Sequence, residues 1–200
     1  MMKRRGAVLF VASIICFASW GRADTPVFDR VFAGADLGGL YGGISALYLT
    51  SSDWDDGYGV GVEAGYRFAH EQAAALRHGP NLESGYYRIK TRRAGQRADF
   101  EIIPLMANYR VGAEVVDGIW LFGGGGVGIG FVDIDPSGMS GGSDQTSMWQ
   151  LFLGMEGPIN DWASLRGGYR HLWVDEMRSG DARIRSDDAS IFEVGVNFWY

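Results

Sequence analysis

Apolar and polar residues alternate with a period of two along several stretches of this chain. In Gly57–Phe68 the even-numbered positions, which form one parity, hold only apolar and aromatic residues. The odd-numbered positions form the other parity and hold only glycine and charged residues. The same alternation appears in Trp149–Gly157, Ala163–Trp173 and Phe192–Tyr200. Alternate side chains of a β-strand point to opposite faces, so each stretch predicts a strand with one apolar and one more polar face.

Weaker alternation predicts four further strands, at Leu37–Leu49, Glu83–Arg92, Phe100–Val111 and Ile119–Val132. The total is then eight strands. The segments between them are rich in turn-forming residues, and the longest early one is Ala69–Asn81. Within it, Glu71–Leu76 is compatible with one helical turn, which Gly79-Pro80 would stop.

The N-terminus has the features of a secretory signal peptide. Lys3, Arg4 and Arg5 precede an uncharged apolar stretch that is too short to span a membrane as a helix, and Gly21 and Ala23 place small residues at the −3 and −1 positions of a cleavage site after residue 23. We therefore divide the chain into a signal peptide (1–23), a short lead-in (24–35) and one β-domain (36–200). Removing residues 1–23 takes away four basic and no acidic residues, which leaves 14 basic against 24 acidic residues, a formal charge of −10.

Composition supports a β-protein and excludes several classes. Glycine supplies 31 of 200 residues, about twice the usual share, and glycine disfavours helices. The single cysteine lies in the predicted signal peptide, which excludes a disulfide framework. The acidic balance argues against nucleic acid as a partner.

The polar parity distinguishes a membrane barrel from a soluble one. It carries charges of both signs, which can pair inside a narrow lumen, while the apolar parity would face lipid and aromatic residues cluster towards strand ends. The sequence therefore predicts an all-β, eight-stranded antiparallel transmembrane up-and-down β-barrel. The charged residues predicted to point inwards are Glu63, Arg67, Arg88, Lys90, Arg110, Glu156, Arg166, Arg170 and Glu193.

The chain resembles the small OmpA/OmpX-type outer-membrane β-barrels of Gram-negative bacteria. The resemblance rests on Ile103–Arg110, Asp161–Arg170 and the C-terminal segment Phe192–Tyr200 with its terminal aromatic residue. It implies location in the outer membrane, contact with its lipid and lipopolysaccharide, a monomer, and periplasmic termini. It also implies that periplasmic chaperones and the barrel-assembly machinery handle the chain. The assembly signal would be formed by Phe192, Val194, Val196, Phe198 and Tyr200. Because the chain ends at Tyr200, no peptidoglycan-binding domain of the OmpA type is expected.

No motif predicts chemistry. Gly123–Gly128 has the glycine spacing of a dinucleotide-binding loop, but strand alternation continues through it, so no cofactor is expected. None of His70, His78 and His171 has a serine two positions later, the spacing used by lipid A deacylase barrels, and no histidine has a metal-ligand partner on its strand. We therefore expect no catalytic, cofactor or metal site, although a Ser–His–carboxylate site can assemble from separate strands.

Three functions stay open. The favoured one is a structural or surface-interaction protein whose lumen is filled by a polar Arg/Glu network. The second is a narrow porin-like channel for ions or small solutes, and the third is a lipid-modifying barrel enzyme. The predicted external links, which include Asp133–Thr146 and Asp175–Asp188, are acidic. They would hold divalent cations or simply be solvated.

Overall fold

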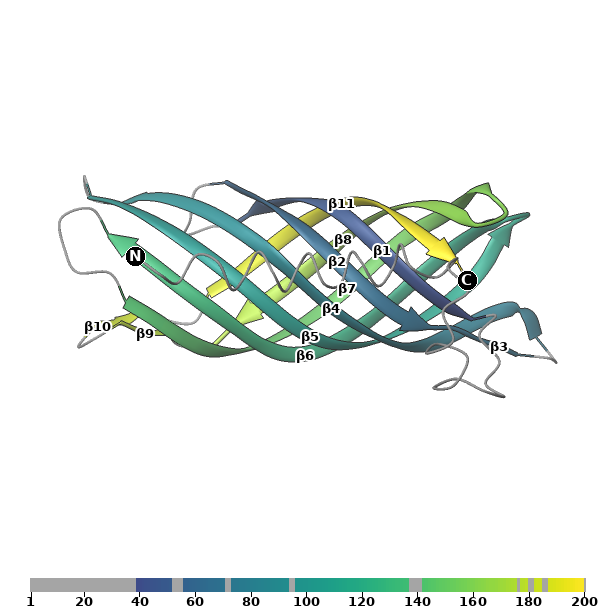
Figure 1. Ribbon diagram of the computed structural model, residues 1–200, viewed down its shortest axis with the longest axis horizontal. Helices are drawn as coiled ribbons and strands as arrows, with labels where there is room; N and C mark the ends of the chain where they lie inside the picture. Colours follow the sequence, from purple (N-terminus) through teal and green to yellow (C-terminus); the bar gives the residue numbers. More distant parts are fainter. Residues whose placement is uncertain are drawn as a thin grey trace, which may run out of the picture.

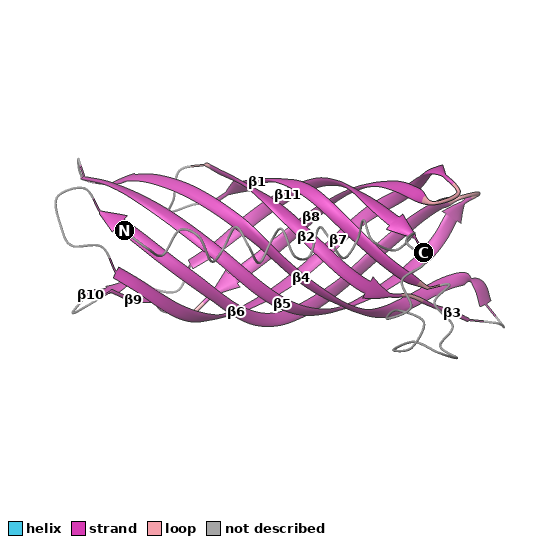
Figure 2. Ribbon diagram, in the orientation of Figure 1, coloured by secondary structure: helices cyan, strands magenta, loops and turns pink. Residues whose placement is uncertain are grey.

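The computed structural model describes residues 39–51, 56–70, 73–93, 96–136, 142–175, 177–179, 182–184 and 187–199, which form a closed β-barrel (Figure 1). In that part of the chain every regular element is a strand (Figure 2). The strands are β1 (Leu40–Thr50), β2 (Gly57–Tyr66), β3 (Phe68–His70), β4 (Ala73–Arg93), β5 (Gln96–Val116), β6 (Ile119–Pro136), β7 (Gly142–Asn160), β8 (Ala163–Val174), β9 (Met177–Ser179), β10 (Ala182–Ile184) and β11 (Asp187–Trp199).

Eight of these described strands close the barrel, each antiparallel to its neighbours. Their order around the wall is β1, β2, β4, β5, β6, β7, β8 and β11, and β11 pairs with β1 to complete the circle. β3 continues the line of β2 along β4, and β9 pairs with β10 as a separate hairpin. The predicted eight-stranded antiparallel up-and-down barrel is confirmed.

The two ends of the barrel differ. At one end, called here the turn end, lie the start of β1, the end of β11 and the tight turns Asp117–Gly118 and Asp161–Trp162. Gly118 has a φ of 74°, a left-handed conformation that favours glycine. The opposite end, called the loop end, carries the β9–β10 hairpin (Figure 1).

Several strands are longer than the sequence predicted. β4 starts at Ala73, so the predicted link Ala69–Asn81 and its helical turn are wrong. Gly79-Pro80, expected to stop that helical turn, lies inside β4, where the pairing of β4 with β2 ends at Gly65–Asn81 and its pairing with β3 includes Phe68–His78. Because the ladder is interrupted between these pairs, a proline without an N–H is tolerated there.

The predicted faces agree with the burial of the side chains. On β7, Leu151 and Leu153 are exposed on the outer face, whereas Gln150 and Phe152 are buried inside. Val62 and Ala163 depart from this pattern, because both have the outward parity but are only 4% and 3% exposed. The predicted signal peptide and lead-in lie outside the described residues. Among the described residues, no helix has the length and apolar character needed to cross a membrane.

Candidate functional site

The lumen contains a network of buried arginine and glutamate side chains. Seven of the nine charged residues predicted to point inwards meet there: Glu63, Arg67, Arg110, Glu156, Arg166, Arg170 and Glu193. Their side chains are at most 9% exposed. Charges buried so deeply persist only when they are paired, and each of these seven lies within 4.0 Å of an opposite charge.

Two of the ion pairs cross the whole lumen. Arg67 Nη2 lies 2.6 Å from Glu156 Oε2, which joins the end of β2 to β7. Arg170 on β8 pairs with Glu83 on β4, and its other terminal nitrogen lies 2.7 Å from Glu193 Oε2 on the adjacent strand β11. A cross-lumen pair is possible because an eight-stranded barrel is just wide enough to be filled by side chains.

Glu63 links the remaining cations. Its carboxylate lies 3.0 Å from Arg110 Nη2 and 2.8 Å from Arg166 Nη1. Arg166 stands directly opposite Glu156 in the register of β7 and β8, yet its close ion pair is with Glu63 on β2. Pairing in the lumen therefore follows the geometry of the interior as well as the order of the strands.

Arg88 is the exception among the predicted lumen residues. Its neighbours Tyr87 and Ile89 are 1% and 2% exposed and point inwards, so Arg88 has the opposite parity and lies on the outer face. There it is registered with Tyr58 on β2 and Glu101 on β5. The prediction failed because the β4 segment alternates weakly, and its parity was assigned from the charges alone. The side chain of Lys90 lies outside the part that the structure describes.

Sequence reasoning missed Glu83 and the neutral polar residues of the lumen. Asn108 Nδ2 donates to Glu83 at 3.1 Å, and Gln150 Nε2 donates to Asn108 Oδ1 at 2.8 Å. Glu156 accepts from Ser164 at 2.6 Å and from Asn197 at 3.2 Å. Asn108, Gln150, Ser164 and Asn197 share the parity of the predicted charges, so counting every polar residue on that parity would have identified them.

The lumen towards the loop end is apolar. Twelve buried side chains form this cluster, which we call the plug: Leu47, Leu49, Tyr87, Ile89, Phe100, Ile102, Met106, Val132, Met148, Leu172, Val174 and Ile191. Most lie near the loop-end termini of their strands. The lumen therefore has an apolar part towards the loop end and a charged part nearer the turn end.

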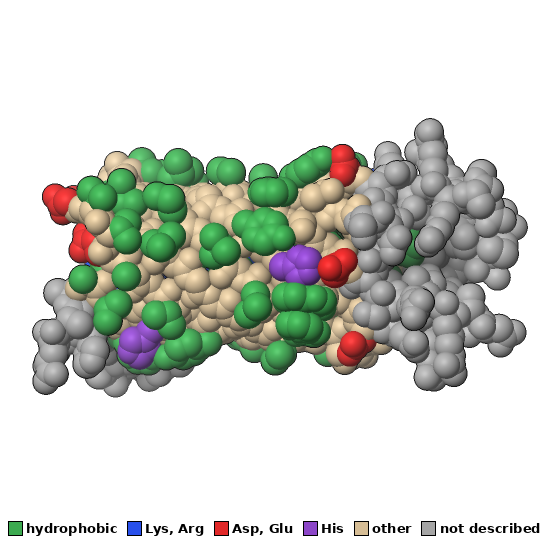
Figure 3. Space-filling view, turned by 180° about the vertical axis from the view of Figure 1, so that it is seen from behind, with side chains coloured by type: hydrophobic (Ala, Val, Ile, Leu, Met, Phe, Trp, Pro, Cys, Tyr) green, Lys and Arg blue, Asp and Glu red, His purple; other side chains and the backbone are tan. Residues whose placement is uncertain are grey.

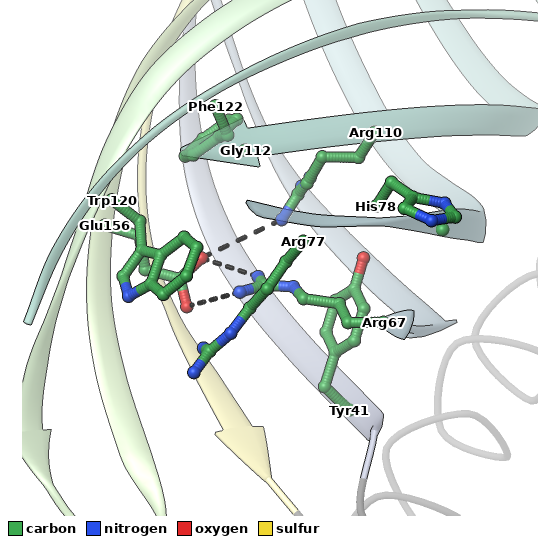
Figure 4. Close-up of a pocket in the computed structure, with 10 residues that line it drawn as sticks. Tyr41, Arg67, Arg77, His78, Arg110, Gly112, Trp120, Phe122 and Glu156 are labelled. Atoms are coloured by element: carbon green, nitrogen blue, oxygen red, sulfur yellow. Dashed lines mark hydrogen bonds and ion pairs between the residues drawn. The ribbon is translucent and has the colours of Figure 1, made fainter. Parts of the chain in front are cut away.

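At the turn end the arginines stack on aromatic rings (Figure 4). The Arg77 guanidinium lies 4.0 Å from the centroid of Trp120, and that of Arg67 lies 4.2 Å from the centroid of Trp199. Such stacking stabilises a cation in addition to any ion pair that it forms. A cavity of about 10 Å³ remains among these side chains, which is space for about one water molecule.

The outer wall is apolar, as Figure 3 shows for one face, where the acidic side chains lie towards the ends. Aromatic pairs mark both ends of the wall. Trp162 stacks on Phe198 near the turn end, and Trp149 stacks on Trp173 nearer the loop end, with ring centroids 3.6 Å apart. Belts of amphipathic aromatic rings are typical of the two interfaces of a membrane.

Four polar side chains interrupt the wall next to the Trp149–Trp173 stack. His171 Nε2 lies 3.0 Å from Asp188 Oδ2, and His171 Nδ1 lies 3.4 Å from the Tyr169 hydroxyl. The Tyr169 hydroxyl is 2.8 Å from Ser190 Oγ. We call Tyr169, His171, Asp188 and Ser190 the wall cluster. A histidine-to-serine spacing within one strand does not indicate this cluster, because its members come from the two strands β8 and β11.

Gly123–Gly128 lies within β6, so it does not open a helix as a dinucleotide-binding loop must. Phe192, Val194, Val196 and Phe198 of the proposed assembly signal lie on the outer parity of β11, while Tyr200 is outside the described residues. No group of three potential metal ligands is found among the residues the structure describes. His78 Nδ1 lies 2.6 Å from the Tyr109 hydroxyl on the outer wall.

Comparison with solved structures shows that other proteins share this fold. Neisserial surface protein A is 18% identical, with a TM-score of 0.61, over 80% of this chain and 97% of that one. Ail, the attachment invasion locus protein of Yersinia pestis, is 12% identical, with a TM-score of 0.50, over 81% of this chain and 97% of that one. The outer membrane enzyme PagL is 13% identical, with a TM-score of 0.53, over 78% of this chain and 97% of that one. At these identities the likeness concerns the fold.

A search of curated proteins finds no match. The model of one family, described as the outer membrane protein beta-barrel domain, matches residues 11–198. The predicted resemblance and the predicted location are confirmed: the chain belongs to the outer membrane protein beta-barrel domain family and is a small barrel of the bacterial outer membrane.

Proposed function

We propose that this protein is a non-conducting barrel with a structural or surface-interaction role in the outer membrane. The observation that carries this proposal is the division of the lumen into the plug and the charged network. A channel needs a continuous polar path, and here twelve apolar side chains stand across the loop-end part of that path. An ion entering such a region loses its hydration shell without gaining polar partners, which is strongly unfavourable.

The charged network also fits a filled interior. Four arginines (67, 110, 166 and 170) face four glutamates (63, 83, 156 and 193), and each forms at least one close ion pair. Neutral side chains such as Asn108 and Gln150 bind the carboxylates and guanidiniums further. A mobile ion would have to displace these fixed partners, so the network fills space and ties opposite strands together.

The surface part of the role belongs to the loop end. Short turns are periplasmic and longer loops are external in barrels of this type, so the loop end faces outwards from the cell. β4 and β5 have 21 residues each and form the longest hairpin. Asp133 and Asp175 are exposed at this end. A ligand or neighbouring cell component would meet this acidic end first.

Planar-bilayer conductance tests the proposal against the channel alternative. The refolded wild-type barrel should show no reproducible unitary conductance, whereas a Phe100→Ala/Met148→Ala variant, with two plug side chains truncated, should show an increased leak. Reproducible wild-type channels whose conductance or selectivity changes in Arg170→Ala would overturn the proposal and favour the channel. Heat-modifiable migration on unboiled gels confirms that each variant is folded.

A further inference from the structure

The wall cluster brings a hydroxyl, a base and a carboxylate into one chain of contacts on the lipid-facing side. Asp188 contacts His171, His171 contacts Tyr169, and Tyr169 contacts Ser190, over distances of 3.0, 3.4 and 2.8 Å. A neutral imidazole that donates from Nε2 to the Asp188 carboxylate accepts at Nδ1, where the Tyr169 hydroxyl lies. The cluster therefore has the order carboxylate, base, bridging hydroxyl and terminal hydroxyl.

The register of two neighbouring strands produces this order. His171 on β8 stands directly opposite Ser190 on β11, and Asp188 stands opposite Trp173. Tyr169 and His171 are two residues apart on β8, as Asp188 and Ser190 are on β11, so all four point outwards. Side chains directly opposite each other in an antiparallel pair have Cβ atoms about 4.5–5.5 Å apart, so small rotamer changes bring His171 and Ser190 closer.

The stacked tryptophans indicate how deep the wall cluster lies in the membrane. Trp149 and Trp173 mark the outer interface, and Asp188 lies at their level. Ser190 and His171 lie two residues further into the membrane, which is about 5 Å along the normal for a strand tilted by about 40°. The ester linkages of membrane lipids lie just inside their headgroups, at this depth. The Asp188 side chain is 48% exposed and that of His171 26%, so lipid and interfacial water reach the cluster.

We propose that the wall cluster is an acyl-ester hydrolysis site for lipids of the outer leaflet, with Ser190 as the nucleophile. His171 is the general base, which acts through the Tyr169 hydroxyl. Asp188 orients the imidazole and stabilises the imidazolium. This activity is additional to the structural or surface role, because the outer wall can act while the lumen stays sealed.

The reaction balances with water as the co-reactant. Ser190 Oγ attacks the ester carbonyl carbon as its proton passes to Tyr169 and the Tyr169 proton passes to His171 Nδ1. The ester C–O bond breaks, the leaving alcohol takes a proton back along the same path, and the acyl chain stays on Ser190. Water then attacks the acyl-serine with the same base, which releases a fatty acid and restores the Ser190 hydroxyl.

Covalent labelling tests the nucleophile directly. The folded barrel in phospholipid vesicles is treated with a lipophilic fluorophosphonate, and the modified residue is mapped by mass spectrometry. Labelling should occur at Ser190, disappear in Ser190→Ala, and fall at least tenfold in His171→Gln. The matched control is Ser147→Ala, because Ser147 is an exposed serine at an outward position of β7. Labelling should be unchanged in that variant.

Turnover is tested on the same samples by measuring fatty-acid release from the vesicle lipids. Wild-type protein should release fatty acid, and Ser190→Ala should lower the rate at least about 100-fold, the usual scale for loss of a catalytic group. Tyr169→Phe should lower kcat more than it changes KM, which a merely structural hydroxyl would not do. Absence of both Ser190 labelling and fatty-acid release from the folded wild-type barrel would overturn the proposal. Because conductance is measured separately, this outcome leaves the sealed-lumen proposal intact.

Discussion

Arg67 and Glu156 form an ion pair across the full width of the barrel, with 2.6 Å between Nη2 and Oε2. β2 and β7 are four strands apart in either direction around the wall, so the two residues come from opposite sides. The pair is reinforced by stacking of Arg67 on Trp199 and by the hydrogen bond from Ser164 to Glu156. The lumen network therefore stabilises the closed cross-section as well as neighbouring strands.

Neutralising one member of this pair should destabilise the barrel. Glu156→Gln leaves the Arg67 cation buried without its carboxylate, a change that costs about 3–5 kcal/mol in other buried pairs. Urea unfolding in lipid vesicles, followed by gel mobility, measures the free energy of unfolding. The double variant Arg67→Gln/Glu156→Gln should lose less free energy of unfolding than the two single variants lose in total. Additive losses would contradict a direct coupling between the two residues.

Truncation of a side chain inside the plug should lower the free energy of unfolding more than the same truncation on the outer wall. Ile191 is 0% exposed in the plug, whereas Ile44 is 44% exposed on the lipid side of β1. Ile191→Ala should lower the free energy of unfolding by about 2–5 kcal/mol, because it leaves a cavity that the neighbours fill only partly. Lipid chains close the space left by Ile44→Ala, so its loss should be smaller. Equal losses in urea unfolding would show that the plug is loosely packed.

The lumen-facing glycines should differ in their tolerance of a methyl group. A Cβ at Gly124 on β6 would lie 2.6 Å from the Phe152 ring and would collide with the Tyr109 carbonyl oxygen. Gly124→Ala should therefore cost about 1–3 kcal/mol through overpacking. Gly112→Ala is the matched control, because a Cβ there meets its nearest atoms at 3.4 and 3.5 Å. In thermal unfolding in detergent, the melting temperature of Gly124→Ala should be well below that of Gly112→Ala.

The C-terminal aromatic residues should matter for assembly in cells more than for folding in vitro. Truncation of Tyr200 combined with Phe198→Ala should reduce the heat-modifiable barrel in outer-membrane fractions, because an assembly signal is read by other proteins. Refolding of the same variant into detergent should proceed nearly as for wild type. Leu153→Ala on the outer wall of β7 is the control and should assemble normally. Normal assembly of the C-terminal variant would remove the signal role from this segment.

The strand faces could be predicted wherever the alternation was strong. Gly57–Phe68 and Phe192–Tyr200 showed their inner and outer faces because a strand with lipid on one side and a packed lumen on the other keeps a strict two-residue period. The period is weak in β4, and there both the start of the strand and the face of Arg88 were wrong. The glycine and proline at positions 79 and 80 suggested a break, but they occupy an interruption in the pairing inside a continuous strand.

The sequence by itself determined the number of barrel strands, and the polarity of their two faces wherever the alternation is strong, because these are local properties of alternation and turn composition. Only the tertiary structure decided which charges meet. Arg67 and Glu156 are 89 positions apart, and Arg170 and Glu83 are 87 apart, and closure of the wall brings both pairs together. The wall cluster has the same origin, since the register between β8 and β11 places Ser190 opposite His171. Register and closure depend on hydrogen bonds between distant segments, which a single strand's pattern does not contain.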